Sequence, residues 1–364
     1  MLSLRGGLLG RGGPGRQTWG RRWLAAATVC AGGCGTVAAV RGPGQPLSGP
    51  GGADYKHTAV HAQRFGEGVD EYWVFSPDDP RPAEAPCVIF LHGWGALHPR
   101  AYGAWIQHMV RKGRIVIYPR YQYADKLRTH GDVMLEGARG AVKAAWSRLN
   151  ESGPVRPIQD RIAWFGHSFG GVLAAKLAAS SAADGLPPPA VLLLIQPGGE
   201  DLVGLDSLKT LPPEILVEFL VGDADTLAGD TGARAIAAAL TDGADRRLEL
   251  VRIRSDRRSN PPLIADHFAP LGAAPDFPPQ PIEGGDTDLP GGPFRDRIRE
   301  RRTEQYGVDA IDFYGFWKLG DALLDAAFDQ RNLEFGFGDT PQQRFMGVLS
   351  DGAPVTPLVV EPIK

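Results

Sequence analysis

The sequence contains one serine whose surroundings favour covalent chemistry. The segment Gly166-His-Ser-Phe-Gly-Gly171 follows a short apolar run at residues 161–165 and precedes an Ala- and Leu-rich stretch at 171–180. If the run is a strand and the stretch is a helix, Ser168 lies on a sharp turn, where any side chain in place of the glycines would collide with a neighbouring element. The helix N-terminus also favours developing negative charge. The pattern therefore predicts that Ser168 is a nucleophile.

A serine hydroxyl is a weak nucleophile and needs a general base. With a turn of this kind, the order along the chain is nucleophile, acid and then base. Seven of the eight histidines precede Ser168, and only His267 follows it. We therefore expect His267, in the loop Ala265-Asp-His-Phe-Ala-Pro270, to take the proton of the hydroxyl.

The acid that orients His267 has three candidates. Asp223 and Asp225 follow the apolar run at residues 215–221, and Asp201 follows the run at 190–195. If these runs are parallel strands, their ends lie at the edge of the sheet that also carries the nucleophile. Asp223 is equally suited to holding the turn, so the residues alone leave the choice open.

An oxyanion needs at least two hydrogen-bond donors. One is expected to be the backbone N–H of Phe169, which directly follows the nucleophile. The loop after the run at 87–91 reads His92-Gly-Trp-Gly95, and we expect the N–H of Trp94 to be the second donor. His92 is expected to fix this loop by hydrogen bonding.

Aromatic residues near these loops indicate an apolar pocket. Trp94 offers a flat apolar wall, although ordinary core packing would also account for it, and Tyr121 and Tyr123 follow the apolar run at 114–118. We expect Trp94, Tyr121 and Tyr123 to contact the substrate.

Apolar runs alternate with helical patterns through residues 54–332. The runs predict strands at 71–75, 87–91, 114–118, 161–165, 190–195, 215–221 and 247–253, the last of them near a sheet edge. Helical spacing is found at 132–149, 171–180, 231–240 and 309–328. Continuous apolar runs are typical of strands buried on both faces. The fold class predicted is α/β, a mostly parallel central sheet with helices on both faces.

Three further segments do not follow this alternation of strands and helices. We expect a flexible linker at residues 41–53 and an irregular C-terminal tail at 333–364. Residues 269–293 are rich in Pro and Gly, and we expect them to form an insertion that serves as a lid or as a plain loop. The mixed charges at 295–302 favour a solvated helix.

The first 52 residues contain six arginines and no acidic residue, with eighteen uncharged residues between Arg22 and Arg41. This pattern predicts an export signal over residues 1–40, with cleavage near Ala39. Alternatively, the segment Ala31-Gly-Gly-Cys34 resembles a lipoprotein cleavage box, which would leave a lipid on Cys34. We expect an exported protein that contacts the membrane only through the signal or that lipid. Its one remaining cysteine, Cys87, excludes an intramolecular disulfide.

The composition excludes several function classes. With 39 basic and 42 acidic residues, the formal net charge is −3, so no basic excess favours a nucleic-acid partner. The sequence has no HExxH motif, no paired cysteines in the body of the chain and no phosphate-binding P-loop. We expect no metal and no cofactor.

Four of the motifs above resemble those of the α/β-hydrolase superfamily, over residues 55–330. They are His92-Gly-Trp-Gly95, Gly166-His-Ser-Phe-Gly-Gly171, Gly222-Asp-Ala-Asp-Thr226 and Asp266-His-Phe-Ala-Pro270. Within it, the set is similar to the bacterial lipase, cutinase and polyester-hydrolase branch. Two features depart from that branch: no C-terminal disulfide can form, and the insertion and long last helix are extra.

The resemblance implies a function and favours Asp225 as the acid. It implies a Ser168–His267–Asp225 triad that hydrolyses carboxylic esters, small or polymeric, through an acyl-enzyme and without a cofactor. The same triad also serves amidases, peptidases and thioesterases, and a non-catalytic binding protein can retain this fold.

Overall fold

The computed structural model describes residues 39–123, 130–206, 208–241, 247–272, 274, 277–279 and 307–363. These residues belong to one compact unit that begins at Ala39. The predicted export signal, except for its last two residues, lies outside them, as do most of the insertion 269–293 and all of the mixed-charge segment 295–302. The export signal, its cleavage and the lipid on Cys34 therefore stay predictions.

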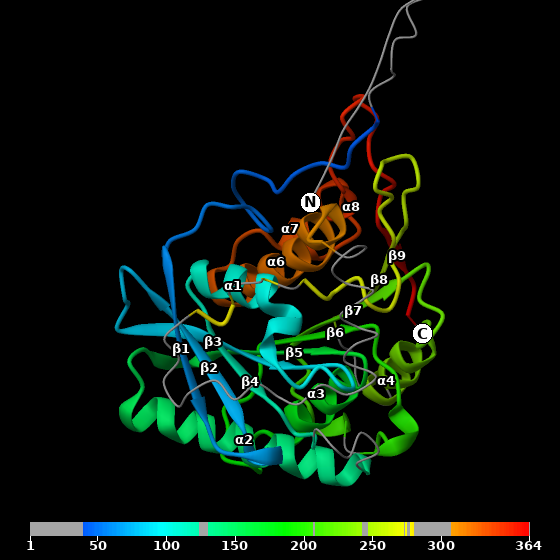
Figure 1. Ribbon diagram of the computed structural model, residues 1–364. Coiled ribbons are helices and arrows are strands. Elements are labelled where there is room, and N and C mark those ends of the chain that lie inside the picture. The colour runs from blue at the N-terminus through cyan, green and yellow to red at the C-terminus, as the bar shows by residue number, and fades with distance from the viewer. Residues whose placement is uncertain are drawn as a thin grey trace, which may run out of the picture. The chain divides into compact units, whose positions relative to one another are not determined.

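The strands of the described chain form one sheet in the order β1-β2-β4-β3-β5-β6-β7-β8-β9 (Figure 1). Strands β4, β3, β5, β6, β7 and β8 are parallel, whereas β1, β2 and β9 run antiparallel to their neighbours. Their bounds are β1 Ala59–Phe65, β2 Tyr72–Asp78, β3 Glu84–Leu91, β4 Ile115–Pro119, β5 Arg156–His167, β6 Val191–Ile195, β7 Leu216–Gly222, β8 Leu248–Ile253 and β9 Val359–Glu361.

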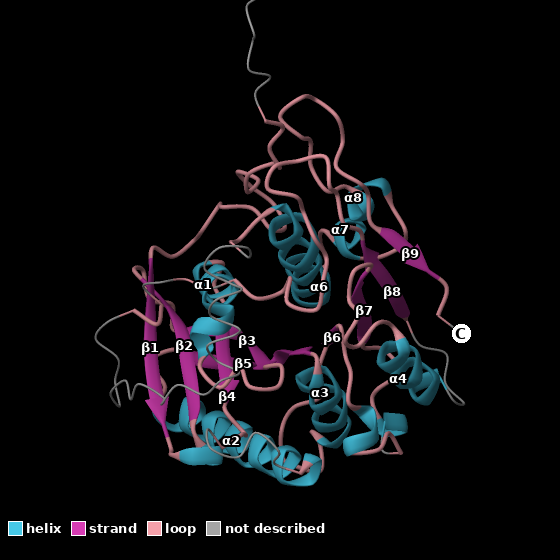
Figure 2. Cartoon of the chain, turned by 45° about the vertical axis from the view of Figure 1, so that its right-hand side comes forward, coloured by secondary structure: helices cyan, strands magenta, loops and turns pink. Residues whose placement is uncertain are grey.

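Helices cover both faces of this sheet, as Figure 2 shows. One face carries α2 (Gly131–Ser152), α3 (Phe169–Ser180) and α4 (Thr231–Thr241); the other carries α1 (Gly103–Arg111) and α6 (Lys318–Asp329). The short helices are η1 Gly68–Asp70, η2 Pro99–Tyr102, η3 Glu200–Leu202, η4 Leu208–Thr210, η5 Ile311–Trp317, α7 Leu333–Gly336 and α8 Pro341–Arg344. The predicted fold class is confirmed. None of the described helices has the length and apolar character needed to cross a membrane.

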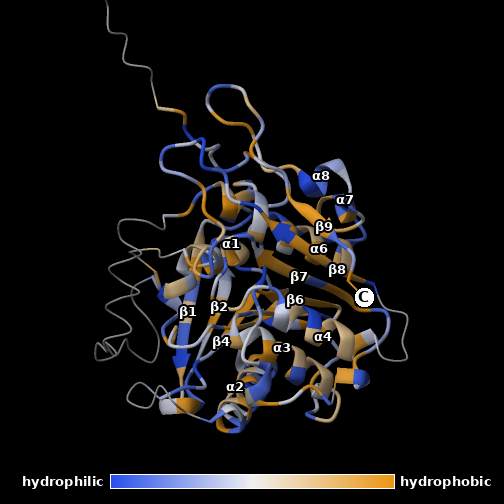
Figure 3. Ribbon diagram, turned by 90° about the vertical axis from the view of Figure 1, so that its right-hand side faces the viewer, coloured by the Kyte–Doolittle hydropathy of each residue, from blue (hydrophilic) through white to orange (hydrophobic). Residues whose placement is uncertain are grey.

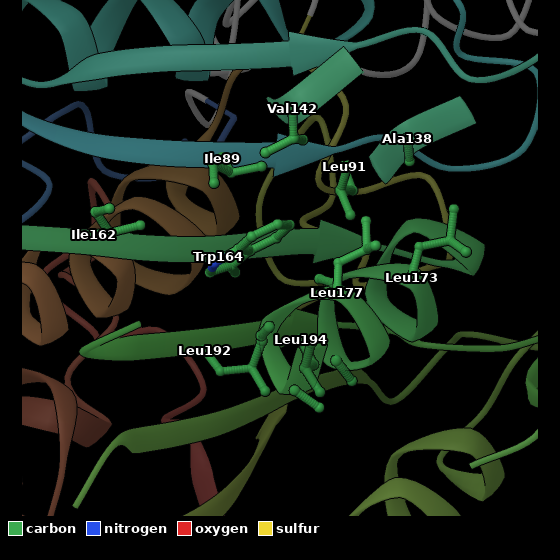
Figure 4. Close-up of a cluster of buried hydrophobic side chains, with 14 of the residues drawn as sticks. Ile89, Leu91, Ala138, Val142, Ile162, Trp164, Leu173, Leu177, Leu192 and Leu194 are labelled. Carbon is green, nitrogen blue, oxygen red and sulfur yellow. The ribbon is translucent and has the colours of Figure 1, made fainter. Parts of the chain in front are cut away.

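The predicted strands are apolar because both of their faces are covered. On one face, Trp164 of β5 and Leu194 of β6 lie against α3, and Ile89 of β3 faces Val142 of α2 (Figure 4). Colouring by hydropathy shows the central strands as the hydrophobic layer of the domain (Figure 3). Alternating patterns are therefore absent from the middle of the sheet.

Besides the short helices, of which α7 and α8 lie in the segment expected to be an irregular tail, two strands and one longer helix were not predicted from the sequence. Strand β1 is half-buried along most of its length, so it lacks an apolar run, and α1 has only nine residues. Strand β9 lies in the segment expected to be an irregular tail, and it pairs with β8 through only three residues. Strand β8, which was expected near an edge, is the second strand from the edge and pairs with β7 on one side and β9 on the other.

Residues 41–53, expected to be a flexible linker, are held against η5 and α6. The N–H of Gly51 donates to Oδ2 of Asp321 at 2.9 Å, and the Gln45 amide donates to the Gly51 carbonyl at 3.0 Å. Gly51 has a φ of +76°, and a Cβ there would lie 2.1 Å from the carbonyl oxygen of Phe313. Glycine in this segment thus permits a close backbone approach.

Asp321 is the centre of this contact. It is 3% exposed and also accepts hydrogen bonds from His108 Nε2 at 2.9 Å and from Arg114 at 3.0 Å. Burial by itself would raise the pKa of Asp321, but the charges and hydrogen bonds of His108 and Arg114 hold that pKa well below its usual range. The carboxylate therefore stays ionised in the folded protein.

Removing this charge should destabilise the fold. We expect Asp321→Asn to lower the free energy of unfolding by about 3 kcal/mol, because it removes one of the two carboxylates that pair with the buried Arg114 and leaves only Asp325, at 2.9 Å. Urea denaturation at neutral pH measures this. The control is Asp329→Asn, whose ion pair with Arg161 is 36% exposed on both sides; we expect it to cost less than about 1 kcal/mol.

The same contact predicts an acid dependence. In the unfolded chain an aspartate takes up a proton near about pH 4, whereas folded Asp321 remains ionised to lower pH, so its contribution is complete above that pH and is lost as the pH falls. The wild type should therefore lose more stability than Asp321→Asn between neutral pH and about pH 3. Parallel losses in the two proteins would contradict this account.

Candidate active site

Ser168 is the single residue between β5 and α3. Its backbone has φ +55° and ψ −128°, a conformation that costs a non-glycine residue about 1–3 kcal/mol. The flanking glycines are required by close packing: a Cβ on Gly166 would lie 2.2 Å from the Gly170 carbonyl oxygen, and one on Gly170 would lie 2.3 Å from that of Leu91. The turn predicted from the sequence is therefore present, and it presents Ser168 at the ends of the parallel strands.

Two hydrogen bonds that share the His267 ring link the predicted nucleophile, base and acid. Nε2 of His267 lies 2.9 Å from Oγ of Ser168, and Nδ1 of His267 lies 2.9 Å from Oδ2 of Asp225. A carboxylate only accepts hydrogen bonds, so Nδ1 carries the hydrogen and the lone pair of Nε2 faces the hydroxyl. This is the arrangement in which an imidazole can take a proton from a serine.

Asp225 is held as an anion. Its second oxygen accepts hydrogen bonds from the N–H groups of Leu227 and Ala228, at 2.9 and 3.0 Å. Burial would raise the pKa of Asp225, but the hydrogen bond and charge of His267 and these two N–H groups lower it below its ordinary value.

The other two carboxylates considered above have different surroundings. Asp223 is exposed and accepts hydrogen bonds from the N–H of Ser255 at 3.0 Å and from its hydroxyl at 2.5 Å. It thereby ties the end of β7 to the chain that follows β8. Asp201 is one of the residues that line the cleft over Ser168. The structure brings only Asp225 to His267.

The loop that carries His267 is fixed by its backbone. The carbonyl oxygens of residues 265–267 accept, in order, from the N–H of Ala224 at 3.0 Å, from Nε2 of Gln196 at 2.8 Å and from Nε2 of His167 at 2.9 Å. These donors follow or end β7, β6 and β5. Gln196 and His167 were not predicted to have a role, although both are polar residues at the end of an apolar run.

The loop after β3 lies against the nucleophile. A Cβ on Gly93 would be 3.3 Å from Cβ of Ser168 and 2.9 Å from Nδ1 of His167. Among the described residues, neither the N–H of Trp94 nor that of Phe169 has a hydrogen-bond acceptor. Both N–H groups are therefore available beside Ser168.

His92 holds this loop, as its position in the sequence suggested. Its ring nitrogens lie 2.8 Å from the Gly93 carbonyl and 2.7 Å from the Arg120 carbonyl. Burial lowers the pKa of His92 to about 4, so the ring is neutral near pH 7 and donates to one carbonyl at a time. It is therefore unsuited to acid–base chemistry on a substrate.

A cleft of about 580 Å³ opens over Ser168. Trp94 and Phe169 form an aromatic wall, with ring centroids 5.7 Å apart and edge to face. Other apolar residues of the cleft include Leu227, Phe268 and Leu271, and Glu200 and Asp201 supply charge.

The expectation that Tyr121 and Tyr123 line the cleft is corrected. Tyr121 is fully buried, stacks on His92 with ring centroids 4.1 Å apart and donates to the His92 carbonyl. Its φ is +39°. Tyr123 is partly exposed next to Gly68. Neither residue lines the cleft.

In the parts of the chain that the structure describes, no group of three His, Cys, Asp or Glu residues is placed to hold a metal ion. The cysteine of the described chain, Cys87, is buried in β3 and carries a free thiol.

The close packing at the turn predicts a specific stability defect. We expect Gly170→Ala to lower the free energy of unfolding by about 3 kcal/mol, because its Cβ meets backbone that cannot move aside. Urea denaturation provides the measurement. Gly44→Ala is the matched control, since a Cβ there meets nothing within 4 Å, and its stability should stay within about 1 kcal/mol of wild type. Equal stabilities of the two variants would refute the packing account.

Comparisons with known proteins agree with this architecture. Residues 88–264, from β3 to the loop that leads to His267, match a family model described as alpha/beta hydrolase fold. The search of curated proteins gave no match. The match covers the sharp turn at Ser168 and the Asp225 loop, and the sheet in which it lies has the mostly parallel order and two-sided helical cover of that fold. The chain therefore has the alpha/beta hydrolase fold.

Proposed function

We propose that the protein is a serine hydrolase that cleaves carboxylic esters. The observation that supports this most directly is the pair of 2.9 Å hydrogen bonds that link Ser168 to His267 and His267 to Asp225. These three residues come from separate loops at one edge of the sheet. A structural role would not require a serine hydroxyl to face the lone pair of an oriented imidazole at the floor of an open cleft.

The proposed reaction has two stages. In the first, Oγ of Ser168 attacks the ester carbonyl while His267 takes its proton, and His267 then protonates the leaving alkoxide. In the second, His267 removes a proton from water as the water attacks the acyl carbonyl, and it then returns that proton to Oγ of Ser168 as the acid product leaves. Asp225 stabilises the imidazolium that forms in each stage.

The N–H groups of Phe169 and Trp94 are proposed to bind the oxyanion. Phe169 opens α3, so its N–H points out of the helix N-terminus. One such donor contributes about 3 kcal/mol to stabilisation of the transition state. The wall formed by Trp94 and Phe169 favours an ester with an apolar acyl or aromatic group next to the carbonyl.

Loss of the nucleophile tests the proposal. We expect Ser168→Ala to lower kcat/KM for p-nitrophenyl butyrate by about a millionfold, with the urea midpoint no lower than that of wild type. Labelling by a fluorophosphonate should occur in the wild type and disappear in the variant. Turnover that survives the substitution would overturn the proposal. If the protein is labelled but cleaves matched amides or thioesters and not esters, the substrate is an amide or thioester. A folded protein that is not labelled would favour a binding function.

The assignment of the acid is tested separately. We expect Asp225→Asn to lower kcat by about ten-thousandfold, because the amide can donate to His267 and so favours the wrong tautomer. Asp223→Asn, two residues away and bonded to Ser255, should keep kcat within about threefold of wild type. Steady-state kinetics on the same ester distinguishes them. Comparable losses of kcat in the two variants would contradict the assignment of Asp225 as the acid of the triad.

A further inference from the structure

Two buried polar side chains beside the site have no part in the reaction above. Tyr102, the last residue of η2, is fully buried, and His167, the residue before the nucleophile, is 2% exposed. They are linked to each other and to both loops that flank Ser168. The N–H of Gly93 lies 2.9 Å from the Tyr102 hydroxyl oxygen, that oxygen lies 2.7 Å from Nδ1 of His167, and Nε2 of His167 lies 2.9 Å from the carbonyl oxygen of His267.

The chemistry of these groups fixes two of the three hydrogens, and a neutral His167 ring places the third. The His267 carbonyl can only accept, so Nε2 of His167 carries a hydrogen and donates it. The Gly93 N–H can only donate, so the Tyr102 oxygen accepts it. With a neutral His167 ring, Nδ1 is an acceptor and takes the Tyr102 hydroxyl hydrogen. This assignment pairs all three contacts without placing a charge on the ring.

A neutral His167 is also what the proposed reaction needs. The rings of His167 and His267 have centroids 5.0 Å apart, and the reaction places a positive charge on His267. A second positive charge at that distance in a buried site would oppose it. Nδ1 of His167 faces the Tyr102 hydroxyl, and that hydroxyl supplies the hydrogen bond that a neutral ring accepts.

The ends of this relay are the two loops whose positions decide the chemistry. Gly93 immediately precedes Trp94, the proposed second oxyanion donor, and the His267 carbonyl belongs to the proposed base. The relay therefore ties both to the residue next to Ser168. Displacement of a catalytic group by about 1 Å can lower a rate by about a hundredfold.

We propose that Tyr102 and His167 are positioning residues: a hydrogen-bond relay from Gly93 through Tyr102 and the neutral His167 ring to the His267 backbone holds the oxyanion loop and the base loop in register with Ser168. This inference rests on the proposed ester hydrolysis and adds to it the residues that set its geometry.

Kinetics of Tyr102→Phe test the relay. The variant keeps the ring, which packs against Phe90, and removes only the hydroxyl. We expect kcat for p-nitrophenyl butyrate to fall about 10- to 100-fold while KM changes by less than about threefold, since the loss is in alignment for the transition state. Tyr55→Phe is the matched control, because the Tyr55 hydroxyl also meets a buried histidine nitrogen, Nδ1 of His108 at 3.2 Å, away from the site. Its kcat should equal that of wild type.

Two substitutions at His167 distinguish the loss of a hydrogen-bond donor from a change in side-chain volume. The amide of His167→Gln can reach the His267 carbonyl with an N–H, whereas His167→Leu has no donor. We expect kcat of the Gln variant to be at least about tenfold higher than kcat of the Leu variant, and the two variants to have similar urea midpoints. Equal kcat values in the two variants would overturn the role given to His167.

A measurement on the wild type keeps the proposal testable if a variant fails to fold. Nitrogen-15 spectra of histidine-labelled protein near neutral pH should show His167 as the neutral tautomer with hydrogen on Nε2, its signals assigned by their loss in His167→Gln. A charged ring, or hydrogen on Nδ1, would overturn the relay.

The two proposals fail in different ways. A wild-type protein that neither turns over the ester nor reacts with the fluorophosphonate would overturn the proposed function. An active wild type whose kcat is unchanged by Tyr102→Phe, or lowered equally by Tyr55→Phe, would overturn the relay and leave the proposed function standing.

Discussion

The close approach of three backbones at the Ser168 turn is the constraint on which the site depends. Gly166, Gly170 and the end of β3 at Leu91 meet so tightly that no side chain fits between them. This contact holds Ser168 at a φ of +55°, a conformation that it would not keep in a free chain. The strain is sustained because β3 and β5 are paired in the middle of the sheet and α3 begins at once.

The remaining parts of the site follow from the parallel sheet. Because β5, β6, β7 and β8 run in the same direction, the loops that follow them meet at one edge. There the backbone of residues 265–267 is bonded to groups at the ends of three successive strands. A single hydrogen bond contributes only about 1 kcal/mol of net stability. The alignment of His267 with Ser168 is therefore a property of the clamped loop more than of the bond between them.

The fold contains a second buried histidine–aspartate pair with a different character. His108 bonds to Asp321, as His267 bonds to Asp225. At Asp321, however, the buried Arg114 supplies a permanent positive charge, and burial lowers the pKa of His108. That pair faces the segment at Gly51 and does not line the cleft over Ser168, and it joins the start of the described domain to α6. The same two residue types thus serve stability in one place and, in the proposed function, orient a general base in the other.

The sequence by itself determined the fold class, the Ser168 turn and the choice of His267. Runs of apolar residues reveal strands covered on both faces, and glycines at fixed places reveal backbone contact, because both are local consequences of burial. Only the tertiary structure decided which carboxylate meets His267, that Tyr121 turns into the core, that residues 41–53 pack on η5 and α6, and that Gln196 and His167 clamp the base loop. Those outcomes depend on which strand ends lie side by side and on the direction in which single side chains point. Both are fixed by contacts between residues far apart in the sequence, so no local pattern predicts them.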